Sequence, residues 1–113
     1  MKTSELQGAA LDWAVAKCEG YETLMCRGKL ETLFTENGWT PSTNWEQGGP
    51  IIEREGIALQ MHFGHWIALP YDSVFSEEAY QQGPTPLVAA MRCYVASKMG
   101  DEVDVPDELL EGE

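Results

Sequence analysis

Residues 85–100 read TPLVAAMRCYVASKMG and carry the clearest helix signals of the chain. Thr85 suits an N-cap, and Pro86 suits the first helical position because the amide hydrogen that it lacks would have no partner there. Residues with helical spacing follow along this stretch: Leu87, Ala90, Met91, Tyr94, Val95 and Lys98. Gly100 then provides a C-terminal cap, so the pattern predicts a helix that runs to Met99.

A second helix is predicted near the start of the chain. Ser4 and Gln7 have the spacing of a capping box, in which the serine oxygen accepts a backbone hydrogen bond and the glutamine reaches back. Apolar side chains then fall on one stripe: Leu6, Ala10, Trp13 and Ala14. We therefore expect a helix from about Glu5 to Cys18, ended by Gly20.

The segments between the two helices favour strands and loops. Residues 21–35 alternate enough to allow a loose hairpin with a turn at 27–29. Short β-type runs follow at residues 51–52, 56–62 and 66–69, and they suit one antiparallel sheet. The stretch from Ser76 to Gln82 is expected to be a surface connection that includes at most one helical turn.

The stretch from Glu36 to Pro50 is dense in Gly, Pro, Asn and Ser, and it predicts a long loop. The fold expected is therefore α+β, with two main helices packed on a small, mainly antiparallel sheet and this loop on one rim. Residues 1–100 are expected to form a single domain, because 113 residues suffice for one core. Residues 101–113 are expected to form an extended or mobile acidic tail.

The charge of the chain excludes some partners. The formal net charge is −12, and the segment from Asp101 to Glu113 contributes seven acidic residues and no basic one. Such a charge repels phosphate backbones and anionic membranes, so we expect neither direct nucleic-acid binding nor membrane binding. The tail itself is interpreted as a solubilising segment or as an electrostatic docking arm for a basic protein.

Cellular location is predicted from three absences in the sequence. No run approaches the length of about 18 apolar residues that a membrane span needs, and the first residues do not resemble a signal peptide. Cys18, Cys26 and Cys93 are odd in number and contain no C-x-x-C pair, which indicates reduced, packed thiols. We therefore expect a cytoplasmic protein without disulfides.

No catalytic or metal-binding motif is present, and no cofactor is expected. His62 and His65 are three residues apart, a spacing that would direct them to opposite faces of one strand and would make them a poor metal pair. Acid–base chemistry by His65 with Glu53 or Glu55 stays open as an alternative.

A candidate binding site is centred on Gly48 and Gly49, next to Pro50. Rings, amides and charges surround this turn, a mixture that suits a planar polar ligand: Trp39, Asn44, Trp45, Gln47, Glu53 and Arg54, with Trp66 and Arg92 as possible further contacts. Three simpler readings stay open. The glycines form an ordinary turn, the two tryptophans cap the core, or Arg54 makes only a solvated ion pair.

The chain resembles the NinX-like family of uncharacterised phage and prophage proteins. The resemblance is carried by residues 8–16 (GAALDWAVA), 41–55 (PSTNWEQGGPIIERE) and 83–92 (GPTPLVAAMR), with VASK at 95–98. These stretches cover roughly half of the chain. The resemblance implies an accessory protein expressed by a phage in the bacterial host cytoplasm, and it supplies no catalytic residue.

Three functional hypotheses follow. The first is a non-enzymatic counter-defence protein that sequesters a small nucleotide-like signal at the candidate site, where a homo-oligomer would supply more sites. The second is an acidic inhibitor of a basic host nuclease or regulator, which deletion of residues 101–113 would abolish. The third, ranked last, is an enzyme of small metabolites that uses Glu53 and His65.

Overall fold

The computed structural model describes residues 1–26, 29–32, 38–70, 80–106 and 109. Its elements follow in chain order: η1 (Thr3–Glu5), α1 (Gly8–Glu19), β1 (Thr23–Cys26), β2 (Lys29–Thr32), α2 (Trp45–Glu55), β3 (Ala58–His62), β4 (His65–Leu69), β5 (Gln81–Gly83) and α3 (Pro86–Met99). The α+β class predicted from the sequence is confirmed. Within the described residues, no helix is long and apolar enough to cross a membrane.

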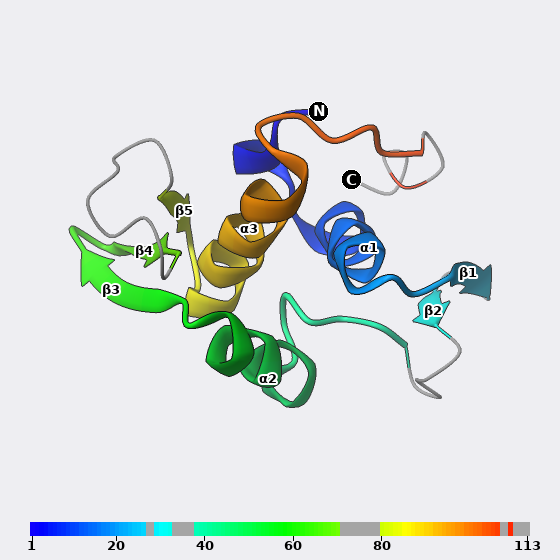
Figure 1. Ribbon diagram of the computed structural model, residues 1–113, viewed down its shortest axis with the longest axis horizontal. Coiled ribbons are helices and arrows are strands. Elements are labelled where there is room, and N and C mark those ends of the chain that lie inside the picture. The colour runs from blue at the N-terminus through cyan, green and yellow to red at the C-terminus, as the bar shows by residue number, and fades with distance from the viewer. Residues whose placement is uncertain (27–28, 33–37, 71–79, 107–108, 110–113) are drawn as a thin grey trace.

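Helix α3 is the centre of the fold (Figure 1), with the three-stranded sheet on one side and α1 on the other. Its predicted limits are confirmed, since the Thr85 side chain accepts a hydrogen bond from the Val88 amide and the Gly100 amide donates to the Ala96 carbonyl. Side chains on most of its circumference are buried: Leu87, Val88, Ala89, Ala90, Met91, Cys93, Tyr94 and Val95. A helix that is apolar nearly all round suits this central position.

Helix α1 begins later than predicted, at Gly8, and Ser4 does not cap it. Residues 3–5 form the separate turn η1, and the Leu6 carbonyl accepts a hydrogen bond from Arg92 Nε at 2.7 Å. Thr3 is also held, because its amide donates to Asp101 and its hydroxyl to Gly100. These long-range contacts determine the structure of residues 3–6, and the capping box predicted there does not form. The predicted end is confirmed by Gly20, which caps α1 in the left-handed conformation.

Two antiparallel sheets are present in the described part of the chain. The hairpin β1–β2 confirms the strands expected between residues 21 and 35, while its turn at residues 27–28 lies outside the described residues. The other sheet has the order β3-β4-β5, and its first two strands match the runs predicted at 56–62 and 66–69. The prediction of a surface connection at 76–82 is wrong for Gln81 and Gln82, which lie in β5; residues 76–79 lie outside the described part.

Helix α2 is the main correction to the sequence analysis, which expected a loop up to Pro50 and a strand at 51–52. Asn44 caps the helix by accepting a hydrogen bond from the Glu46 amide. Gly48 lies so close to the rest of the fold that a Cβ built on it would be 2.5 Å from the Pro41 carbonyl oxygen. The glycine therefore serves close packing of a helix, and it does not mark a turn.

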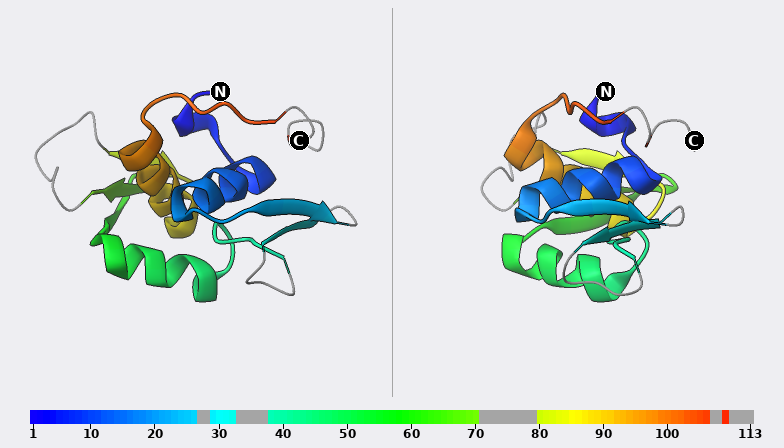
Figure 2. Two further views of the ribbon diagram at one scale, coloured as in Figure 1. Left: turned by 45° about the vertical axis from the view of Figure 1, so that its right-hand side comes forward. Right: turned by 90° about the vertical axis from the view of Figure 1, so that its right-hand side faces the viewer.

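The segment after α3 is extended and lies beside the N-terminus (Figure 2). Lys2 and Glu102 form an isolated antiparallel bridge, and the Met1 ammonium donates to the Val103 carbonyl at 3.0 Å. The side chains of Val103, Val105 and Leu109 belong to the hydrophobic core cluster. Deletion of residues 101–113 would thus remove core side chains together with the acidic ones.

Candidate functional site

The ten residues proposed from the sequence do not gather at one place. Trp39 is 5% exposed and belongs to the core, where its indole Nε1 donates to the Asp12 carbonyl at 2.9 Å. Trp45 lies at the start of α2 and is 55% exposed. Trp66 lies in β4 and packs partly buried against the core. The expectation of two indoles around one turn is therefore wrong, because one indole is a core side chain and the other faces solvent.

The amides near the start of α2 hold the backbone in place. Asn44 is the N-cap of α2, and Gln47 accepts from the Thr40 amide at 2.6 Å while it donates to the Gly38 carbonyl at 3.0 Å. Gly49 lies against the Trp45 ring, 3.9 Å from an ideal Cβ to the ring carbon Cε3. These groups already have partners within the chain, so they are poorly available to a ligand.

A shallow hollow of about 260 Å³ does lie beside Trp45, between the starts of α2 and α3. Its lining is small or apolar: Ser42, Thr43, Trp45, Thr85, Pro86, Leu87 and Val88. No charged side chain is among these lining residues. The hollow therefore offers apolar contact but no means to select an anion.

Arg54 belongs to an ion-pair network at the far end of α2. Its guanidinium binds both oxygens of Glu19, at 2.6 and 3.0 Å, and its Nε donates to Glu55 at 2.8 Å. The Tyr94 hydroxyl donates to Glu19 at 2.6 Å. Burial acts to raise the pKa of Glu19, but the hydrogen bonds from Arg54 and Tyr94 outweigh it and the pKa is lowered. This network connects the ends of α1 and α2 to α3. Arg54 thus takes part in ion pairs, which is the simpler reading that the sequence left open for it.

The acid–base pair of the third hypothesis is not assembled. Glu53 is exposed near the end of α2, whereas His65 follows the turn at the opposite end of β3. His65 pairs across that turn with His62, with ring centroids 6.1 Å apart. The two imidazoles thus lie on the same face of the sheet, and the prediction of opposite faces is wrong because the residues belong to two strands. Among the described residues no group of three metal-ligating side chains occurs.

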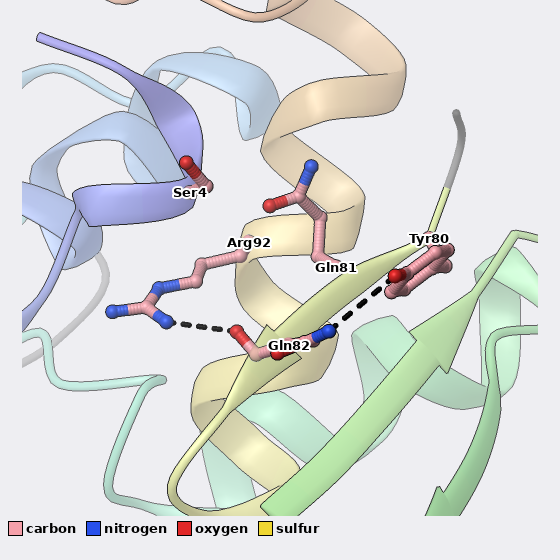
Figure 3. A pocket seen from close by; sticks show the side chains of 5 residues that line it. All are labelled: Ser4, Tyr80, Gln81, Gln82 and Arg92. Carbon is pink, nitrogen blue, oxygen red and sulfur yellow. Dashed lines mark hydrogen bonds between the residues drawn. The ribbon is translucent and has the colours of Figure 1, made fainter. Parts of the chain in front are cut away.

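A pocket of about 430 Å³ lies where η1, β5 and α3 meet. Figure 3 shows its lining residues: Ser4, Tyr80, Gln81, Gln82 and Arg92. The volume is within the range of small-molecule sites. Of these five residues, only Arg92 is among the site residues predicted from the sequence.

Arg92 extends from α3 into this pocket, where it contacts two backbone carbonyls. Its Nε donates to Leu6 at 2.7 Å and its Nη1 to Gln82 at 2.8 Å. No carboxylate within the described residues forms a salt bridge with it. Burial lowers the pKa of Arg92, because the cation is partly removed from water without a counter-charge. A half-buried guanidinium in this state favours an anion that supplies the missing charge.

Gln81 lines the same pocket and has a side-chain acceptor without a partner among the described residues. Its Oε1 is buried and has no hydrogen-bond partner within the described part of the chain. The carboxamide oxygen lies on the side of Ser4 (Figure 3). A buried acceptor without a partner costs about 1–3 kcal/mol, and such groups are uncommon in folded proteins.

A second hollow of about 310 Å³ adjoins the first, because Ser4 and Gln81 line both. It adds the charged residues Lys2, Asp101 and Glu102. The second hollow thus holds both acidic residues and a lysine, whereas Arg92 is the only charged residue among the described ones that line the first hollow. We call the first hollow the Arg92 pocket.

Asp12 is a buried carboxylate that fixes the turn before α2. It is 4% exposed, and its Oδ1 accepts from the Ser42 amide at 2.9 Å. Burial raises the pKa of Asp12 to about 6, although hydrogen bonds from Ser42 act to lower it. The charged form is therefore disfavoured in the folded protein relative to the unfolded chain.

We predict that neutralising this group alters the pH dependence of stability. Because the folded pKa lies above the unfolded value of 3.8, the contribution of Asp12 to the free energy of unfolding increases as the pH falls from 7 to 4. As the pH falls over this range, the free energy of unfolding of the wild type should increase by about 2 to 3 kcal/mol more than that of Asp12→Asn, as measured by urea unfolding. Asp104→Asn neutralises an exposed carboxylate and serves as the control. A difference between wild type and Asp12→Asn that is independent of pH would contradict the prediction.

Two of the three cysteines take structural positions. Cys93 is buried in α3, Cys18 is partly buried, and both are free thiols. Burial raises the pKa of Cys18 to about 11 and that of Cys93 to about 12. Both groups are therefore protonated and unreactive at neutral pH.

Comparison with known proteins gives one family. The model described as "Bacteriophage P22, NinX" matches residues 2–98, which span all the elements from η1 to nearly the end of α3. The resemblance inferred from the sequence is confirmed. A search of curated proteins gave no match.

Proposed function

Because the chain belongs to the phage family described as bacteriophage P22 NinX, we propose that it is a phage accessory protein that acts by binding. Its ligand is a small nucleotide-like anion, which the Arg92 pocket sequesters in the host cytoplasm as a counter-defence. This proposal keeps the ligand class expected from the sequence and moves the site away from the Trp39–Arg54 segment.

One observation carries the proposal: within the described part of the chain, a buried acceptor without a partner and a cation without a carboxylate partner line the same pocket. Gln81 Oε1 requires a hydrogen-bond donor, and Arg92 favours a negative charge. A nucleotide provides both, since its base carries N–H donors and its phosphate is an anion. The Tyr80 ring in the pocket lining adds an aromatic surface for the base.

The charge of the whole protein does not exclude an anion at this position. Although the net charge is −12, the lining of the Arg92 pocket contains no carboxylate among the described residues. The nearest acidic residues in the adjoining hollow are Asp101 and Glu102. Repulsion from more distant carboxylates decays over a Debye length of about 8 Å at physiological salt.

Calorimetry with a matched ligand series tests the proposal. We expect adenosine and guanosine to bind weakly, their monophosphates and cyclic dinucleotides to bind with a Kd of about 10 µM or below, and no product to form. Inorganic phosphate alone should bind weakly, because it leaves Gln81 without a donor. Absence of binding by every nucleotide at millimolar concentration would overturn the proposal, and so would turnover of a bound nucleotide.

A second candidate function is supported by the exposed carboxylates of the C-terminal segment. Glu102 is 72% exposed at its side chain, and Asp101 and Asp104 are exposed beside it. These groups form a surface for a basic host protein. Since deletion would remove buried valines, the test is the triple substitution Asp101→Asn, Glu102→Gln and Asp104→Asn. It should abolish an inhibitory activity of this kind and leave nucleotide binding in place.

A further inference from the structure

The hairpin β3–β4 is an uncharged region of a strongly acidic protein. Residues 56–71 contain no Asp, Glu, Lys or Arg, whereas the chain as a whole carries −12. Two apolar side chains are exposed here, Met61 at 53% and Phe63 at 90%. Solvation alone gives no reason for either side chain at these positions.

The turn of this hairpin is also strained. Phe63 has a φ of 48° and Gly64 a φ of 85°, so both central residues of the two-residue turn have positive φ. Asn or Gly is usual at the first of these positions, and a bulky side chain there is unfavourable. The strain places an exposed aromatic ring at the tip of the hairpin, where it forms an edge-to-face pair with His62, with ring centroids 4.4 Å apart. A costly exposed ring of this kind indicates an interaction surface.

Strand β3 is an unprotected sheet edge. Among the described strands only β4 pairs with it, and it carries none of the charges or prolines that commonly protect an edge. His62 and His65 flank a two-residue turn, so they form a hydrogen-bonded pair, and the pairs then alternate along the ladder. Leu59 and Met61 therefore direct their backbone N–H and C=O groups to the free edge.

We infer that β3 pairs antiparallel with β3 of a second copy of this chain, across a two-fold axis at Gln60. In this register Leu59 of each copy lies opposite Met61 of the other, so their outward backbone groups form hydrogen bonds. The exposed Met61 then lies against Leu59 of the second copy, and Phe63 lies beside the start of that copy's β3. The outcome is one six-stranded sheet.

The backbone of the edge strand identifies a second copy as the occupant, and the uncharged hairpin allows it to approach. Two chains of −12 repel each other at most approaches, and the hairpin is a face where they can meet without opposed carboxylates. An antiparallel edge strand is also complementary to itself, because each outward donor meets an outward acceptor across the axis. A five-residue strand buries less area than a standard interface, so we expect a dissociation constant on the order of 10 µM.

Sedimentation equilibrium from 1 to 200 µM tests this inference. The wild type should change from monomer to dimer, and Met61→Lys should raise the dissociation constant at least tenfold, because it places like charges beside the axis. The matched control is Trp45→Lys, which removes a side chain of similar exposure (55%) at the distant start of α2. This control should dimerise like the wild type. Circular dichroism establishes that both variants are folded.

A cross-link tests the register independently. Gln60→Cys places two thiols on the axis in a non-hydrogen-bonded pair, where Cβ atoms lie about 4.5–5.5 Å apart, close enough for a disulfide after a small adjustment. Oxidation should give a disulfide dimer at least ten times faster than in Gln82→Cys, which lies on the same sheet face but in β5. A wild type that stays monomeric at 200 µM would overturn the inference, as would equal rates for the two cysteine variants or a Met61→Lys protein that still dimerises.

Discussion

Arg92→Gln is expected to weaken nucleotide monophosphate binding by about ten- to a hundredfold, measured by calorimetry. Among the described residues that line the pocket, the guanidinium supplies the only positive charge, and a charge-assisted hydrogen bond contributes about 1.5–3 kcal/mol. The same substitution leaves the Leu6 and Gln82 carbonyls without their donor. Some loss of thermal stability will therefore accompany the loss of affinity.

Two variants separate these effects. Arg92→Lys keeps the charge and loses the planar fork, so its affinity should lie between those of the wild type and Arg92→Gln. Lys17→Gln changes the net charge by the same amount at an exposed position on α1, and it should bind like the wild type. If Lys17→Gln weakens binding as much as Arg92→Gln, long-range charge and not the pocket controls affinity.

Gly83→Ala is expected to lower the free energy of unfolding by about 3 kcal/mol, because it overpacks the contact between β5 and α3. An ideal Cβ on Gly83 would lie 2.6 Å from the Ala89 nitrogen and 3.1 Å from the Val88 carbonyl carbon. Both are backbone atoms of α3, so neither can move without shifting the helix. The contact also positions Gln81 and Gln82 beside Arg92, and the variant should therefore bind nucleotide less well.

Gly49→Ala is the matched control for this substitution. An ideal Cβ there meets only the Trp45 ring at 3.9 Å, an ordinary contact. Because alanine is favoured over glycine within a helix by about 1 kcal/mol, this variant should be as stable as the wild type or slightly more stable. Urea unfolding of both variants measures the difference, and equal stabilities would show that β5 can move away from α3 at little cost.

The features that could be predicted from the sequence are those set by local chemistry. Thr85, Pro86 and Gly100 determine the limits of α3 through contacts within a few residues, and Gly20 ends α1 in the same way. The hairpin β3–β4 was predicted for a similar reason, since its two apolar runs are separated by a short turn.

The features that escaped prediction depend on contacts between distant residues. Helix α2 contains two glycines and a proline, and the packing of Gly48 against Pro41 and Leu87 explains the first of these glycines. One local signal was overlooked, because Asn44 and Gln47 have the spacing of a capping box. Strand β5 has no β-branched residue and depends on pairing with β4.

The Arg92 pocket could not have been assembled from the sequence. Its residues come from η1, β5 and α3, and Ser4 is more than seventy positions from the others. Gln81 in particular carries no sequence signal, since an unpaired acceptor is a property of its surroundings. Arg92 was chosen as a cation on a predicted helix, and its lack of a carboxylate partner is visible only in the fold.

The most direct test of a ligand-binding pocket is the effect of Gln81→Leu on stability and on affinity. Leucine has a similar size and removes the buried acceptor. The free energy of unfolding of the ligand-free variant should therefore be about 1 kcal/mol higher than that of the wild type. Gln82→Leu, at an exposed position of β5, should leave stability unchanged. Nucleotide affinity of Gln81→Leu should meanwhile fall at least tenfold. A Gln81→Leu protein that is less stable than the wild type would contradict the account. So would a Gln81→Leu protein that binds nucleotide as tightly as the wild type.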